Sequence, residues 1–159
     1  MLKKYAVTFG FLGLALFATS SLEGLQLSKA TFQEKIVLDA NGNKKRKMLP
    51  VTTVKRGSVL VYVDRIISKA TEEKHNITIY NPIPLGTGYL KGTATCEGAC
   101  KILFSIDGGK TYKNGEELYV IYGAKKRLAK GSEYTHIKYT FSTISPFTQT
   151  RMAFKALVK

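Results

Sequence analysis

Short runs of alternating apolar and polar residues, separated by turn signals, account for most of this sequence. The clearest run is THIKYTF at 135–141, in which every second residue is apolar, the period of a half-buried β-strand. RMAFKALVK at 151–159 repeats the pattern. Turn-forming pairs such as Asn41-Gly42 and Gly108-Gly109 separate the runs at the spacing of antiparallel sandwiches and barrels. The other predicted strands are 27–38, 51–55, 59–67, 76–80, 89–95, 101–106 and 118–122.

These patterns predict an all-β protein in which two antiparallel sheets pack face to face as a β-sandwich. One segment departs from the alternation. Residues 59–63, VLVYV, are apolar at every position, which predicts a strand covered on both faces. Asp64 follows directly, and we expect it to mark either the emergence of the strand into solvent or a β-bulge that redirects it.

The first residues have the three-part layout of a secretory signal. A basic start, MLKK, precedes an apolar run at 5–18 and a small-residue cleavage site at 18–20. An uncleaved anchor is the alternative, although a membrane span needs about 20 apolar residues. The sequence thus predicts an exported protein, periplasmic or extracellular. Its predicted parts are a signal peptide at 1–20, an N-terminal strand and basic loop at 21–49, and the sandwich domain at 50–159.

The chain is strongly basic, with 25 Lys and Arg against 11 Asp and Glu and a formal charge of +14. The charge gathers in two runs that each follow a turn signal, so we expect both runs on loop tips. Two interpretations are open: solvated tips that need no ligand, or an anion-binding site for polysaccharide, lipid head groups or nucleic acid. The residues are Lys44, Lys45, Arg46 and Lys47 in one run and Lys125, Lys126 and Arg127 in the other.

The stretch SIDGGKTY at 105–112 has the spacing S-x-D-x-G-x-T-aromatic of the Asp-box found in sialidases and other secreted glycosidases. The same spacing suits a turn in which an Asp carboxylate accepts backbone N–H groups, Gly takes a positive φ and the aromatic ring packs over the loop. A glycosidase also needs a second positioned carboxylate or a nucleophile, and the box occurs once. We predict a structural turn formed by Ser105, Asp107, Gly109, Thr111 and Tyr112.

Cys96 and Cys100, in the stretch CEGAC, are predicted to form a disulfide, because an exported protein with a closely spaced pair favours one. The bond would close a tight loop between the strands at 89–95 and 101–106. A metal site, a redox pair or free thiols are the alternatives. A metal site needs four ligands, which only the distant His75 and His136, both expected in solvent, could complete. Redox pairs prefer C-x-x-C spacing.

Several segments resemble the conserved-repeat module of bacterial surface and exported proteins known as the DUF11 family, over roughly residues 50 to 159. They are RGSVLVY at 56–62, YNPIPLGTGYLKGTA at 80–94, FSIDGGKTY at 104–112, YTHIKY at 134–139 and FKALVK at 154–159. The resemblance implies an immunoglobulin-like β-sandwich in the cell envelope, with no known catalysis. Ser58 and Asn81 stand where the family usually has Asp, so no ligand site is carried over.

The predicted function is a non-catalytic, exported binding or structural module of the cell envelope that acts through a protein partner. Segment 27–38 is the candidate contact, because it lies outside the resemblance and can pair as an extra strand or insert into a neighbouring protein. The alternative is a binder of anionic polymer through the two basic runs, and a hydrolase is a third hypothesis. No catalytic residue, cofactor, metal ion or small-molecule substrate is predicted.

Overall fold

The structure is a computed structural model that describes residues 24–159; the predicted signal peptide lies outside this range. The described part is built of β-strands and two short 3₁₀ helices, and it contains no helix long and apolar enough to cross a membrane. The elements are β1 (Leu25–Leu38), β2 (Lys44–Pro50), β3 (Val59–Ser68), β4 (Lys74–Pro82), β5 (Thr87–Tyr89), β6 (Thr95–Cys96), β7 (Cys100–Ser105), η1 (Gly115–Glu117), β8 (Tyr119–Tyr122), β9 (Lys125–Leu128), η2 (Gly131–Glu133), β10 (His136–Ile144) and β11 (Gln149–Val158).

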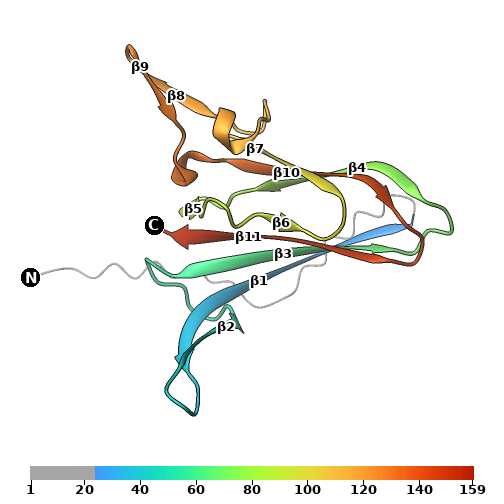
Figure 1. Cartoon of the computed structure of the whole chain (residues 1–159), viewed down its shortest axis with the longest axis horizontal. Helices are drawn as coiled ribbons and strands as arrows, with labels where there is room; N and C mark the ends of the chain where they lie inside the picture. Colours follow the sequence, from blue (N-terminus) through green and yellow to red (C-terminus); the bar gives the residue numbers. More distant parts are fainter. Residues whose placement is uncertain (1–23) are drawn as a thin grey trace, which may run out of the picture.

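Two antiparallel sheets pack on each other, which confirms the all-β class and the layered architecture. The larger sheet has the strand order β2-β1-β3-β11-β5, with β6 also paired to β11, and the smaller sheet has the order β4-β10-β7. Strands β8 and β9 form a separate two-stranded ribbon. Figure 1 shows the two layers, with β10 and β4 above β11 and β3.

The core lies between the layers and follows the predicted alternation. On β10, Ile137 and Tyr139 are fully buried, and on β11 Met152 and Ala156 are fully buried. The hydroxyl of Tyr139 donates to the carbonyl of Ala153 at 3.1 Å, so one hydrogen bond links the two sheets through the core. Burial also raises the pKa of Tyr139, because the phenolate would be desolvated.

Strand β3 is covered on both faces, as its continuous apolar run predicts. Leu60 faces the core, whereas Val61 and Val63 are buried on the outer face of the sheet, where Phe32 packs against them. The prediction made for Asp64 is wrong. Asp64 is only 5 % exposed and pairs in regular register with both neighbouring strands, so it marks neither an exit into solvent nor a bulge.

The charge of Asp64 is buried because a lysine from the adjacent strand reaches it. The Lys29 ammonium lies 3.4 Å from Asp64 Oδ2 and donates to Asn81 Oδ1 at 2.8 Å. Asn81 is itself 4 % exposed and belongs to β4 in the smaller sheet. This cluster therefore connects β1, β3 and β4 at the edge of the core.

Two of the predicted strands are wrong. Residues 51–55 form no strand. The predicted strand at 89–95 is divided into β5 and β6, because Gly92 takes a φ of +78° and the Thr93 hydroxyl donates to the Leu90 carbonyl at 2.6 Å, which closes a turn. The loop closed by the cysteines therefore connects β6 in the larger sheet with β7 in the smaller sheet, rather than two strands of one hairpin.

Strand β1 is also placed differently from the expectation for segment 27–38. It pairs with β3 over Leu25–Glu34 and with β2 over Phe32–Leu38, so it belongs to its own sheet and is not held out for insertion into a neighbour. The strand at the end of this sheet is β2. The candidate edge for a partner accordingly moves from β1 to β2.

Candidate functional site

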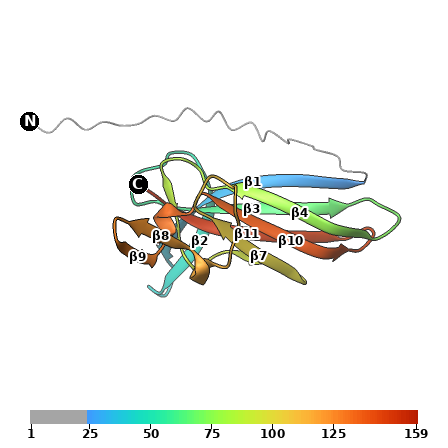
Figure 2. The same ribbon diagram turned by 90° about the horizontal axis from the view of Figure 1, so that it is seen from above.

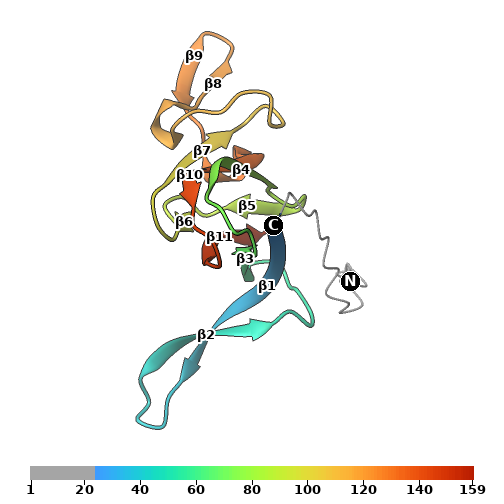
Figure 3. The same ribbon diagram turned by 90° about the vertical axis from the view of Figure 1, so that its right-hand side faces the viewer.

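Two hairpins project from the sandwich, β1–β2 from the larger sheet and β8–β9 from the side of the smaller sheet. Figures 1 and 2 place both near the end of the sandwich where the C-terminus lies, and Figure 3 shows them extending in opposite directions. Both predicted basic runs lie on these hairpins. The prediction that both runs lie on loop tips is wrong, however, because Lys44–Lys47 lie within β2 and Lys125–Arg127 lie within β9. Charged residues fit these strands because both faces of each ribbon meet solvent.

The tip of the β1–β2 hairpin is held by its own hydrogen bonds. One carboxylate oxygen of Asp39 accepts the amides of Asn41 and Asn43, each at 2.9 Å, and the Lys45 ammonium lies 3.2 Å from the other oxygen. The Asn43 amide and the other bonds lower the pKa of Asp39. Gly42 takes a φ of +78° at the turn. The tip is thus preorganised without a ligand.

The base of this hairpin is bound to the sandwich by polar contacts. Glu34 forms an ion pair with Lys155 on β11, and its second oxygen lies 3.9 Å from Arg46 Nε on β2. Gln33 is 8 % exposed and donates to the Ser58 hydroxyl at 3.1 Å. The hairpin is therefore a continuation of the larger sheet.

The strand register gives the β1–β2 hairpin two different faces. Residues opposite each other in an antiparallel pair share a face, and β1 and β2 pair Ile36 with Arg46 and Lys35 with Lys47. One face carries Ile36, Leu38 and Met48, which are 66 %, 66 % and 51 % exposed. The same face also carries Lys44 and Arg46, and the opposite face carries Lys35, Lys45 and Lys47 beside Val37 and Leu49. Each face of the ribbon therefore combines cations with apolar side chains, and its most exposed apolar side chains lie on one face.

The β8–β9 hairpin also exposes large apolar side chains beside cations. Ile121 is 74 % exposed and Tyr122 is 82 % exposed. Their partners across the ribbon are Lys126 and Lys125, and the Lys126 ammonium lies 4.3 Å from the centre of the Tyr119 ring, a cation–π contact. Tyr122 and the cations of β9 line a shallow surface depression.

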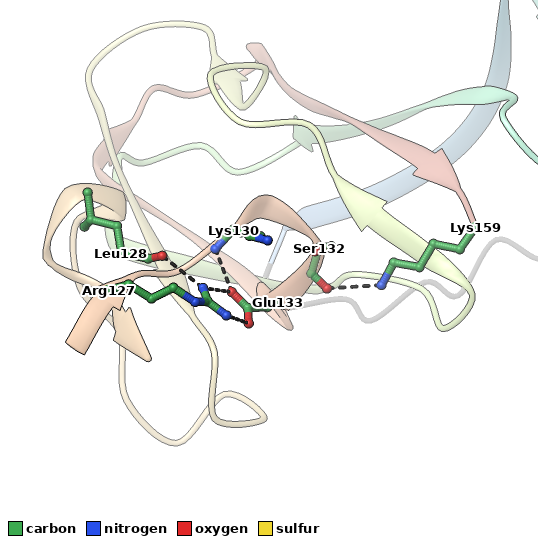
Figure 4. A network of polar contacts seen from close by, with 6 residues as sticks. All are labelled: Arg127, Leu128, Lys130, Ser132, Glu133 and Lys159. Carbon is green, nitrogen blue, oxygen red and sulfur yellow. Dashed lines mark hydrogen bonds and ion pairs between the residues drawn. The ribbon is translucent and has the colours of Figure 1, made fainter. Parts of the chain in front are cut away.

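A network of polar contacts fixes the base of this second hairpin (Figure 4). Arg127 donates to both carboxylate oxygens of Glu133, at 2.8 and 2.6 Å, and the Lys130 amide donates to the same carboxylate at 2.7 Å. Arg127 and then the Lys130 amide lower the pKa of Glu133 to about 2. Lys159, near the chain end, donates to the Ser132 carbonyl at 3.1 Å. The charge of Arg127 is thus engaged within the protein.

The two basic runs therefore divide into paired and unpaired cations. Lys45, Arg46 and Arg127 contact carboxylates. Within residues 24–159 the other four cations of the runs form no ion pair, and all four are exposed. These four are Lys44, Lys47, Lys125 and Lys126.

The Asp-box forms a closed turn. Asp107 Oδ1 accepts the Ser105 hydroxyl at 2.6 Å and the amides of Lys110 and Thr111 at 3.1 and 3.0 Å, while Oδ2 accepts the Thr111 hydroxyl at 2.6 Å. The Ser105 hydroxyl, the largest of these effects, and the other donors hold the pKa of Asp107 well below its usual range. Gly109 has a φ of +84°, and the Tyr112 hydroxyl lies close to it. The carboxylate thus serves the turn itself.

The cysteines and histidines do not come together as a metal site. Cys96 and Cys100 form a disulfide with a Cα–Cα distance of 6.5 Å. His75 is exposed and pairs opposite Thr143, whereas His136 lies at the other end of β10. His136, expected in solvent, is half-buried, and its Nδ1 has no hydrogen-bond partner among the described residues. Those residues contain no group of three or more His, Cys, Asp or Glu side chains placed to hold a metal ion.

Comparison with known proteins identifies no relative of this chain: no family model, no curated protein and no solved structure matches it. The functional argument accordingly rests on the hairpins. Sequence reasoning located their basic runs but missed their exposed apolar residues, Ile36 and Ile121 among them. The signal available for the first hairpin was Asn41-Gly42 between the apolar run at 36–38 and the basic run at 44–47. It indicates a turn between two strands of one ribbon, but not which of their side chains are exposed.

Proposed function

We propose that this protein is an exported, non-catalytic binding module of the cell envelope that acts through a protein partner. The observation that carries the proposal is the exposure of large apolar side chains on the two projecting hairpins, most of all Ile36, Leu38, Ile121 and Tyr122. Apolar side chains that gather on a projecting element and are rimmed by polar groups are typical of protein interaction sites. The partner would cover these side chains and leave the sandwich as a rigid scaffold.

The remaining parts of the proposal rest on the sequence and on the architecture together. The packed antiparallel sheets, with the chain crossing between them from β3 to β4 and from β10 to β11, support the immunoglobulin-like type that the resemblance to DUF11 implies. The signal-like start supports export. The disulfide agrees with an oxidising compartment such as the periplasm or the cell surface.

The test is site-specific crosslinking in intact cells that express the protein. A photoreactive residue at position 36 or 121 should capture discrete protein partners, which mass spectrometry would identify. Phe147 offers a matched control, because it is 74 % exposed but lies in the turn between β10 and β11. Equal capture at all three positions, or no protein captured at either hairpin, would contradict the proposal.

A second candidate function is binding of an anionic polymer, and the four lysines without an ion-pair partner favour it. Each phosphate contact made by a lysine contributes about 0.7 to the slope of log affinity against log salt for single-stranded nucleic acid. Replacing Lys44, Lys47, Lys125 and Lys126 by Gln should therefore flatten the slope by up to about 3. Arg127→Gln should change it less, because Glu133 already holds that cation. An unchanged slope in the fourfold variant would exclude this candidate.

A further inference from the structure

We infer that β2 is an acceptor strand, whose free edge binds an extended acidic segment of a partner protein as an added strand of the larger sheet. This inference rests on the proposed function and names both the partner class and the way it binds. Strand addition joins a peptide to a sheet through main-chain hydrogen bonds, and neighbouring side chains supply the selectivity.

The free edge follows from the register of the hairpin. Strand β2 is the last strand of the larger sheet and pairs only with β1 in the described part of the chain. The Asp39 amide donates to the Asn43 carbonyl at 2.9 Å, which makes this a hydrogen-bonded pair. Hydrogen-bonded and non-hydrogen-bonded pairs alternate along an antiparallel ladder. The pairs that contain Lys45 and Lys47 are therefore hydrogen-bonded, and the amides of these two residues point toward β1. The outward amides are those of Lys44, Arg46 and Met48.

The side chains along this edge select for acidic residues. The run Lys44–Lys47 alternates between the two faces of the ribbon, so an added strand would meet cations on both of its faces. Opposite charges on directly paired strands are stabilising. Met48 and Leu49 follow the cations, so the complementary segment carries several acidic residues next to two apolar ones. Pro50 ends the strand and has no amide to offer.

The same charges argue against a second copy of this chain as the occupant. Another β2 would bring its own four cations to the edge, and like charges on paired strands are destabilising. Lysines on an edge strand also protect against aggregation. Protection alone does not account for the hairpin, however, because the neighbouring Ile36, Leu38 and Met48 remain in water on one face. An added strand lies beside β2 in the plane of the sheet and places its own apolar residues next to Met48.

The hairpin is already held in the conformation that strand addition requires. Asp39 fixes the tip, the Glu34–Lys155 ion pair fixes the base, and Phe32 packs against Val61 and Val63. A preorganised edge lowers the ordering cost of binding, because only the incoming segment has to become ordered.

The experiment measures binding of the full chain to a fluorescent peptide, acetylated and amidated, with the sequence Thr-Val-Val-Glu-Glu-Glu-Glu-Thr, which complements β2 in antiparallel order. The informative variant is Met48→Pro, which removes an outward amide without changing any charge and without removing an amide that bonds to β1. Met48→Ala is the matched control, because it shortens the side chain and keeps the amide. We expect binding by the wild type, about tenfold weaker binding by Met48→Pro, and a smaller loss for Met48→Ala.

Amide hydrogen exchange provides the second readout. On peptide binding, the amides of residues 44, 46 and 48 should become protected, whereas those of 45, 47 and 49 are already bonded to β1 and should change little. No binding, or binding that Met48→Pro leaves intact without protection of the outward amides, would overturn the inference. The same holds if the chain binds vesicles of phosphatidylglycerol and phosphatidylcholine but not the peptide. In each case, partners captured at position 121 would still support the proposed function.

Discussion

Replacing Lys29 by Met should destabilise the protein by removing the cation that, among the described residues, compensates the charge of Asp64 buried at the edge of the core. Asp64 is 5 % exposed, and among the described residues its Oδ2 atom has no hydrogen-bond partner, so the Lys29 ammonium at 3.4 Å is its nearest compensation. Asn81 would lose its donor as well. Methionine keeps an unbranched side chain of similar length, so the change removes the charge and the donor while leaving most of the packing.

The size of the expected destabilisation follows from the unequal burial of Lys29 and Asp64. An exposed ion pair contributes up to about 1 kcal/mol, and removing one member of a fully buried pair costs about 3–5 kcal/mol. The Lys29 side chain is 47 % exposed while that of Asp64 is 7 % exposed, so we expect a loss of about 2 kcal/mol. With a urea m-value of about 2 kcal/mol/M, the unfolding midpoint would fall by about 1 M.

Two further variants test the reasoning behind this number. Lys35→Met changes an exposed lysine of the same strand, which contacts no buried carboxylate, and should leave the midpoint nearly unchanged. The double variant Lys29→Met/Asp64→Leu should recover most of the loss, because no uncompensated charge remains in the core. The explanation fails if Lys29→Met costs less than about 0.5 kcal/mol, or if the double variant is as unstable as Lys29→Met alone.

Two other predictions concern the Asp-box and the disulfide. The pKa of Asp107 is lowered in the folded state, so its carboxylate stabilises the fold above the ordinary pKa of about 3.8 and this stabilisation is lost as the pH falls below that value. Asp107→Asn should therefore lower the urea midpoint at pH 7 more than near pH 3, and an equal loss at both would refute the carboxylate's role. The Cys96–Cys100 loop has a sequence separation of 4, so loop-closure entropy predicts that replacing both cysteines by Ser costs about 2 kcal/mol. A much larger loss in urea unfolding would mean that the crossing between the sheets depends on the bond.

The core strands could be predicted because the alternating pattern that identifies a strand is local in the sequence. Ile137, Tyr139 and Phe141 on β10 and Met152, Phe154 and Ala156 on β11 are buried at every second position, so a period of two in the sequence is enough to identify the strand and its inner face. The division between β5 and β6 was not predicted, because it depends on a turn that the Thr93 hydroxyl closes by donating to the Leu90 carbonyl. A strand-forming Thr and a turn-forming Thr look alike in a single sequence.

The parts that depend on distant residues were harder to predict. Asp64 was expected at an exit into solvent or at a β-bulge, because its partner, Lys29, lies on another strand and the residues around Asp64 give no sign of it. The basic runs were visible as charge, but their position on strands required the pairing of β1 with β2 and of β8 with β9. The exposure of Ile36 and Leu38 could not be predicted, because the apolar run at 36–38 is the same in the sequence whether or not a second layer covers the strand.

The unequal width of the two sheets explains why the binding features gather on the β1–β2 hairpin. In residues 24–159 the larger sheet carries β2 and β1 beyond β3, while the smaller sheet consists of β4, β10 and β7 and reaches β1 through the Lys29–Asn81 contact. Beyond Glu34, where the pairing with β3 ends, β1 extends to Leu38 without a covering layer, so both faces of the ribbon meet water. A strand in that position can hold a run of cations that no core strand would tolerate, and it keeps its outward amides free. The exposed apolar residues, the cations and the open edge thus follow from one feature of the fold, which is why we place the partner there.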